Sequence, residues 1–146
     1  MTHKHGFQLQ QVLNYRKEVE KVKKLEFATA RHEFEHASDV LSRHEAEADR
    51  ARVEYNNKQA VGTTANELKL YADFFARKHM DIQFQRIEVD NLNRKMSEKR
   101  EDLMDAAKEK KALELLKEKQ MRAFRREMAE RERAFLDEMA LQKVAR

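Results

Sequence analysis

The chain has 146 residues, no proline, no cysteine, two glycines and 40% charged residues, a composition that suits long exposed helices better than a globular core. The lack of cysteine excludes a disulfide framework, a thiolate metal site and a cysteine nucleophile. The net charge of +4 comes from interleaved charges of both signs, so we expect no nucleic-acid partner.

Apolar runs along the chain are far shorter than the ~20 residues that span a bilayer. The first six residues also lack the apolar stretch of a secretory signal. We therefore expect a cytoplasmic protein without direct membrane insertion.

Residues 7–61 predict a first helix, because nothing in this stretch breaks a helix and apolar residues recur every seven positions. Glu20 interrupts this column. Its apolar members are Leu13, Phe27, Phe34, Leu41, Ala48 and Tyr55.

A turn is predicted at residues 62–64. Gly62 can adopt the left-handed conformation that ends a helix. Thr64 and Glu67 have the spacing of a capping box, in which a threonine and a glutamate satisfy free backbone donors at a helix start.

Residues 65–143 predict a second, longer helix with its own column of Leu68, Phe75, Ile82, Val89, Met96 and Leu103. Folding the chain back at Gly62 sets Tyr55 near Leu68 and Phe27 near Met96, to within about a turn. The sequence thus predicts an all-α fold, a long antiparallel two-helix coiled-coil hairpin that forms a single domain over residues 1–146.

The end of the second helix is predicted to lack an internal partner, because the register brings Phe7 level with about Leu116. An apolar stripe nevertheless continues beyond that point, and such a face is normally buried. We interpret the stripe as a docking surface for another protein. The alternatives are that residues 1–6 wrap it or that it self-associates. Its members are Met121, Phe124, Met128, Phe135 and Met139.

Charge is unevenly distributed along this end. Basic residues dominate residues 108–126, and acidic residues including Asp137 and Glu138 follow them. Such a pattern could steer the helix into a charged partner.

Near the turn, Leu70 and Phe74 lie outside the column and its flanking positions, whereas Tyr71 flanks it. We expect Phe74 to be exposed. It is either a single exposed apolar residue of the ordinary kind or the anchor of a second partner.

Two histidines could indicate a catalytic zinc site. His32 and His36 have the spacing of a zinc-protease motif, with Glu33 beside the first. A catalytic zinc also needs a third ligand and a shaped pocket, which a two-helix hairpin does not offer. We expect solvated histidines, no metal, no cofactor and no enzyme activity. His44 and His79 are predicted to lie near each other, where they could make helix pairing sensitive to pH.

Three segments of the chain resemble a known family. Residues 7–16 (FQLQQVLNYR) resemble the opening of the flagellar export protein FliJ, residues 111–119 (KALELLKEK) its basic, leucine-containing segment, and residues 136–140 (LDEMA) its terminal Asp-Glu motif. The similarity spans nearly the whole chain and includes the longer second helix. Injectisome counterparts share this architecture.

The resemblance implies a non-catalytic, cytoplasmic component of type III flagellar export, peripherally associated with the inner-membrane apparatus. Its implied partners are the hexameric export ATPase, the cytoplasmic domain of the export gate and the export chaperones. We expect the gate to contact Leu70, Tyr71 and Phe74. We expect the ATPase to contact Leu9, Leu13, Arg16, Lys117, Met121, Phe124, Met128, Phe135, Asp137 and Glu138.

A structural adaptor, such as a stalk or stator-like coiled coil that dimerises through the C-terminal end, is the alternative. We expect a chain that is monomeric in isolation.

Overall fold

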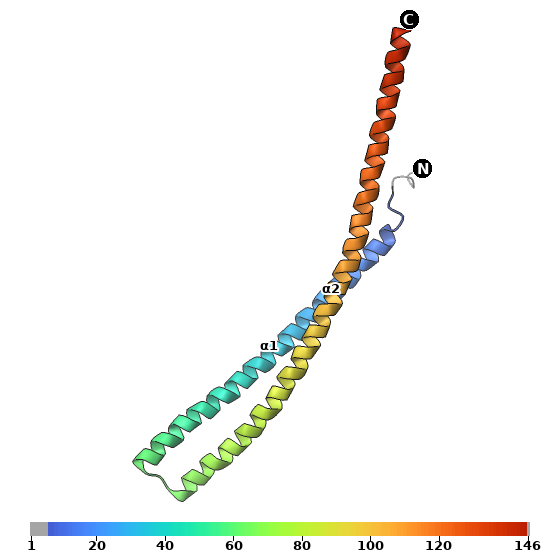
Figure 1. Ribbon diagram of the computed structural model, residues 1–146. Helices are drawn as coiled ribbons and strands as arrows, with labels where there is room; N and C mark the ends of the chain where they lie inside the picture. Colours follow the sequence, from blue (N-terminus) through green and yellow to red (C-terminus); the bar gives the residue numbers. More distant parts are fainter. Residues whose placement is uncertain (1–5, 146) are drawn as a thin grey trace. The chain divides into compact units, whose positions relative to one another are not determined.

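The computed structural model describes residues 6–145, which form two α-helices and no strand (Figure 1). Helix α1 spans Gln10–Val61 and helix α2 spans Ala65–Val144, with 52 and 80 residues. The prediction of an all-α helical hairpin with a longer second helix is confirmed. Helix α1 begins at Gln10 rather than at residue 7, and Phe7 lies in the segment before it.

The turn has the geometry expected from its residues. Gly62 has a φ of 109°, and its amide donates to the carbonyl oxygen of Lys58 at 2.8 Å, which closes the end of α1. Thr64 caps α2, because its hydroxyl oxygen accepts a bond from the Glu67 amide at 3.2 Å. The Glu67 carboxylate instead accepts from the neighbouring Thr63 hydroxyl at 2.6 Å, so the capping box is only half formed.

The chain divides into two compact units, and each contains part of both helices. One unit comprises Lys23–Leu103 and includes the turn; the other combines Met1–Val22 with Met104–Arg146. The prediction that residues 1–146 form a single domain stays a prediction.

In the Lys23–Leu103 unit, small residues of α1 form the most buried part of the seam. Larger seam residues are half-buried, because two helices alone cover only one stripe of each other. The buried alanines are Ala30, Ala37, Ala48 and Ala51.

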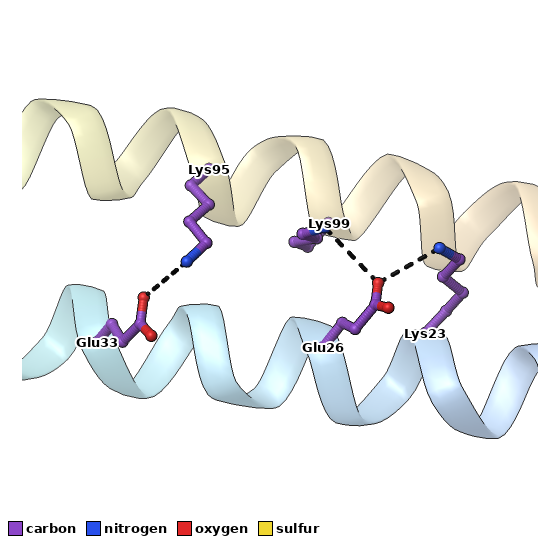
Figure 2. Close-up of polar contacts among 5 residues, drawn as sticks. All are labelled: Lys23, Glu26, Glu33, Lys95 and Lys99. Atoms are coloured by element: carbon purple, nitrogen blue, oxygen red, sulfur yellow. Dashed lines mark hydrogen bonds and ion pairs between the residues drawn. The ribbon is translucent and has the colours of Figure 1, made fainter.

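Ion pairs flank this seam (Figure 2). The Glu26 carboxylate lies 3.3 Å from the Lys23 ammonium of its own helix and 3.7 Å from that of Lys99 on α2. Glu33 pairs with Lys95 at 3.1 Å. Partly exposed pairs of this kind contribute only tenths of a kcal/mol each, but they select one pairing of the helices over others.

In the other unit, Leu13 is the most deeply buried large side chain among the described residues, with 1% of its surface exposed. Glu20 and Lys110 meet across the seam at 2.8 Å, and Arg16 forms an ion pair with Glu109. These contacts hold the start of α1 against α2.

Candidate functional site

Near the turn, the structure has an open groove of about 400 Å³, here called the tip groove. Leu70 is 69% exposed at its edge, and Tyr71 and Phe74 are half-buried within it. The three predicted tip residues therefore come together in one groove. Its lining is Ala51, Glu54, Lys58, Glu67, Leu70, Tyr71, Phe74 and Arg77.

An aromatic cluster adjoins the tip groove through Tyr71 and Phe74. The Tyr55 ring packs edge-on against Tyr71 and Phe75, with centroid separations of 5.6 Å and 5.8 Å. The Lys58 ammonium lies 5.6 Å from the Tyr71 ring centroid. Burial raises the pKa of Tyr71, and its hydrogen bond with Glu54 raises this pKa further.

Phe74 is half-buried rather than exposed, which corrects the expectation for this residue. The Phe74 ring packs against the Phe75 ring, with 6.0 Å between the two ring centroids. The Lys78 ammonium lies 5.8 Å from the centroid of the Phe74 ring. These neighbours cover part of the ring, while the rest lines the tip groove.

Lys78 links the two helices beside the groove. Its ammonium forms an ion pair with Glu47 and lies 3.0 Å from His44 Nδ1. The hydrogen bond and charge of Lys78 lower the pKa of Glu47. His44 thus contacts Lys78, and the side chain of the next residue, His79, is exposed. A pH-dependent role for His44 and His79 stays a prediction.

Two grooves lie where the start of the chain meets α2, and both are within one compact unit. The first, here called the Phe7 groove, has a volume of about 240 Å³, and both Phe7 and Phe124 line it. The second, the Leu13 groove, has a volume of about 340 Å³ and includes Leu13 and Lys17. Lys117, Met121 and Arg125 line both.

The position of Phe7 agrees with the predicted register to within about a helical turn. Phe7 lies beside Met121 and Phe124, about one helical turn further along α2 than the predicted Leu116. Met121 and Phe124 therefore have an internal neighbour, and the part of α2 whose described side chains are all exposed begins at Arg125.

Beyond the two grooves, Met128 and Phe135 line a shallow open surface with Phe124. Phe135 is 60% exposed, and Met139 continues the same stripe. We call Met128, Phe135 and Met139 the C-terminal stripe. Asp137 and Glu138 are exposed beside it and, within residues 6–145, form no ion pair.

The other residues predicted for the ATPase end differ in accessibility. Leu9 is exposed, whereas Leu13 is buried in the seam and Arg16 is held by Glu109. Leu13 and Arg16 thus pack and orient the start of α1 more than they offer free contact area.

Sequence reasoning missed Lys17 as part of this surface, and it included Arg125 only in the basic stretch of residues 108–126 and not among the expected contact residues. Arg125 is four residues from Met121 and eight from Lys117, so helical spacing places the three in one row. The helical spacing of Lys117, Met121 and Arg125 can be read from the sequence. The position of Lys17 opposite them cannot, because it depends on how α1 and α2 are aligned.

The family model described as the flagellar FliJ protein matches residues 4–146. The chain belongs to the FliJ family. This confirms the resemblance, and it makes the chain a component of the flagellar protein export apparatus. The FliJ family is a cytoplasmic, non-enzymatic part of that apparatus. No curated protein and no solved structure matches the chain.

The segments that carry the FliJ resemblance fall on the surfaces described above. Residues 7–16 and 111–119 lie in the same compact unit and border the two grooves, while residues 136–140 follow Phe135 in the exposed part of α2.

Two further findings concern chemistry and membranes. Among the described residues of this FliJ-family chain, no group of three or more histidines, cysteines or carboxylates could hold a metal ion. His32 and His36 are exposed. Neither described helix has a stretch long and apolar enough to cross a bilayer.

Proposed function

We propose that the chain binds and regulates the hexameric export ATPase through the end of α2 and the two grooves beside it. It also links the ATPase to the cytoplasmic domain of the export gate and to export chaperones, in peripheral association with the inner-membrane apparatus. Its role is regulatory and not catalytic. Family membership supports the setting, and the exposed surfaces support the contacts.

The observation that best supports a contact with the ATPase is the exposure of the C-terminal stripe. Phe135 and Met139 are 60% and 47% exposed, and within the described residues no other segment covers them. An apolar face on a helix gains most of its stability from being buried, so a partner surface is its natural complement. Asp137 and Glu138 beside the stripe add charge that fixes orientation.

Regulation follows from symmetry. One chain cannot make the same contacts with six identical subunits, so binding favours different states in different subunits. If the chain binds the assembled ring and not its free subunits, mass action also favours ring assembly.

The tip groove supports the contact with the gate. It combines the exposed Leu70 and the edge of Phe74 with polar side chains at the rim, as protein contact sites commonly do.

A crossover experiment tests both contacts. Phe124→Asp and Phe135→Asp place a negative charge on the surface of this chain that we propose binds the ATPase. Leu70→Asp places a negative charge at the tip groove. The first two variants should lose stimulation of ATPase activity and keep binding to the gate domain. Leu70→Asp should show the opposite pattern, so each variant controls the other.

The readouts are steady-state ATP hydrolysis by the purified ATPase and pull-down of the gate domain. If the wild-type chain does not stimulate ATP hydrolysis, the proposal that it regulates the ATPase is wrong. If Leu70→Asp keeps full gate binding, the tip assignment is wrong.

A further inference from the structure

A row of three side chains on α2 separates the Phe7 groove from the Leu13 groove. Lys117, Met121 and Arg125 line both grooves and follow one another at intervals of four residues. The row therefore alternates cation, apolar side chain and cation, with about 12 Å between the backbone positions of Lys117 and Arg125.

The charges of this row lack carboxylate partners among the residues that the structure describes. Within residues 6–145, neither Lys117, Arg125 nor the facing Lys17 forms an ion pair. Neighbouring Arg122 is matched by Glu118 at 3.7 Å. Other cations on the same helix, such as Lys110, do have carboxylate partners. Glu114 and Glu118 also line the Leu13 groove, but Lys17, Lys117, Arg122 and Arg125 outnumber them, so the two grooves together carry an excess of positive charge.

The apolar residues beside the row restrict the kind of partner that fits the site. Met121 is 45% exposed at the centre of the row, with Phe7 and Phe124 on one side and Leu13 at the base of the other. A nucleic acid or another simple polyanion would satisfy the cations but leave these apolar surfaces in water. An acidic amphipathic helix satisfies both, because its carboxylates and apolar side chains lie on one face.

We infer that the row Lys117–Met121–Arg125 with its two grooves is a docking site for an acidic amphipathic helix of a partner protein. That helix carries two carboxylates about eight residues apart, which pair with Lys117 and Arg125. Apolar side chains between the carboxylates enter the grooves on either side of Met121. The inference rests on the proposed function, since it names the chemistry of the segment that the ATPase presents.

The test uses the full chain and a synthetic helical peptide as the probe. The peptide carries two glutamates about eight residues apart and two leucines midway between them, and a control peptide has lysines in place of the glutamates. Binding is measured by fluorescence anisotropy at low and high salt, because screening should weaken this contact. A single-stranded oligonucleotide serves as a polyanion without apolar side chains.

Two charge-reversal pairs on α2 are compared. Lys117→Glu/Arg125→Glu changes the row, and Lys119→Glu/Arg126→Glu makes the same change in charge on the opposite face of the helix. Reversal at the row should weaken binding of the glutamate peptide roughly tenfold or more and create binding of the lysine peptide. The control pair should bind like the wild type.

Met121→Ser checks the apolar part, and it should weaken binding while keeping the preference for glutamate. The inference is overturned if the wild-type chain does not bind the glutamate peptide, if it binds the oligonucleotide equally well, or if both reversal pairs behave alike. Circular dichroism confirms that every variant retains its helices.

Binding of the purified ATPase to the same variants separates this inference from the proposed function. If the ATPase binds the wild-type chain and the row variant equally, the docking site is wrong and the proposed function stands. If the ATPase does not bind the wild-type chain but the glutamate peptide does, the proposed function is wrong and the site stands.

Discussion

Glu20 and Lys110 show how two polar residues can occupy an apolar seam. Glu20 takes an apolar position of the α1 column, and Lys110 lies seven residues after Leu103 in the α2 column. The two interruptions meet at 2.8 Å, with 8% of the Glu20 side chain and 25% of the Lys110 side chain exposed. The hydrogen bond with Glu20 raises the pKa of Lys110. A polar pair at one level of a seam disfavours shifted registers, because a shift would separate its members.

Removing one member of this pair should destabilise the fold more than removing both. Lys110→Leu leaves the Glu20 carboxylate in the seam without its cross-helix partner, so the thermal midpoint should fall. Glu20→Leu/Lys110→Leu should recover the midpoint to wild-type level or above. Thermal unfolding monitored by circular dichroism gives all three values. A double variant less stable than Lys110→Leu would contradict this account.

The pH dependence of the same pair has a definite sign. The folded chain holds a proton on Lys110 more tightly than the unfolded chain, whose lysine has a pKa of about 10.4. The contribution is therefore complete below that pKa and is lost as pH rises through the folded value. The difference in thermal midpoint between the wild type and Lys110→Leu should therefore become smaller at strongly alkaline pH.

Both helices owe their boundaries to local chemistry that the sequence displays. Gly62 ends α1 and Thr64 starts α2, and both positions were predicted from the residue types alone. The start of α1 was less predictable. The amide of Gln10 bonds to the carbonyl oxygen of Phe7 in a turn before the helix, an arrangement for which the residues there give no distinct signal.

Gly62→Ala tests the turn. A β-carbon at this position meets no atom within 4 Å, so the substitution creates no clash. The cost comes from the positive φ of 109°, which side-chain-bearing residues rarely adopt, and should be about 1–2 kcal/mol. Urea unfolding measures it as a lower midpoint with an unchanged slope. An unchanged midpoint would show that the turn can relax to another conformation without cost.

The pairing of the helices was predictable only to within about a turn. Apolar residues that repeat every seven positions are compatible with neighbouring alignments, and ion pairs such as Glu33 with Lys95 decide between them. This uncertainty explains why Lys17 was missed as part of the site, since its neighbours depend on the register. It also explains why Phe124 was expected to lack an internal neighbour. Lys117, Met121 and Phe124 were predicted to belong to one partner-binding surface, and they line one groove because one helix carries all three. Their part in binding stays a prediction.

For the molecule as a whole, family membership places the chain in flagellar export, while its oligomeric state is open to a direct test. The C-terminal stripe extends from Met128 to Met139, or roughly two heptads, which is less than the three or four that ordinarily sustain a coiled coil. Charged Arg131 and Glu132 also lie among its residues. These features favour a hetero-partner over self-association.

Multi-angle light scattering should therefore give the mass of one chain, 17.5 kDa, at micromolar concentration. Phe135→Asp should leave that mass unchanged. A dimer of the wild-type chain that Phe135→Asp converts to a monomer would instead favour the adaptor alternative, in which the stripe pairs two copies.

The aromatic cluster beside the tip groove gives the protein a built-in optical reporter. The chain has no tryptophan and three tyrosines, and two of these, Tyr55 and Tyr71, are in contact beside the turn. Replacing Tyr15 with phenylalanine would leave all tyrosine emission to that pair. A partner that covers the tip groove would then change the intrinsic fluorescence of an unlabelled chain, and one that binds only the C-terminal stripe would leave it constant. Binding at the tip groove could then be followed on its own, with a form of the gate domain that contains neither tryptophan nor tyrosine.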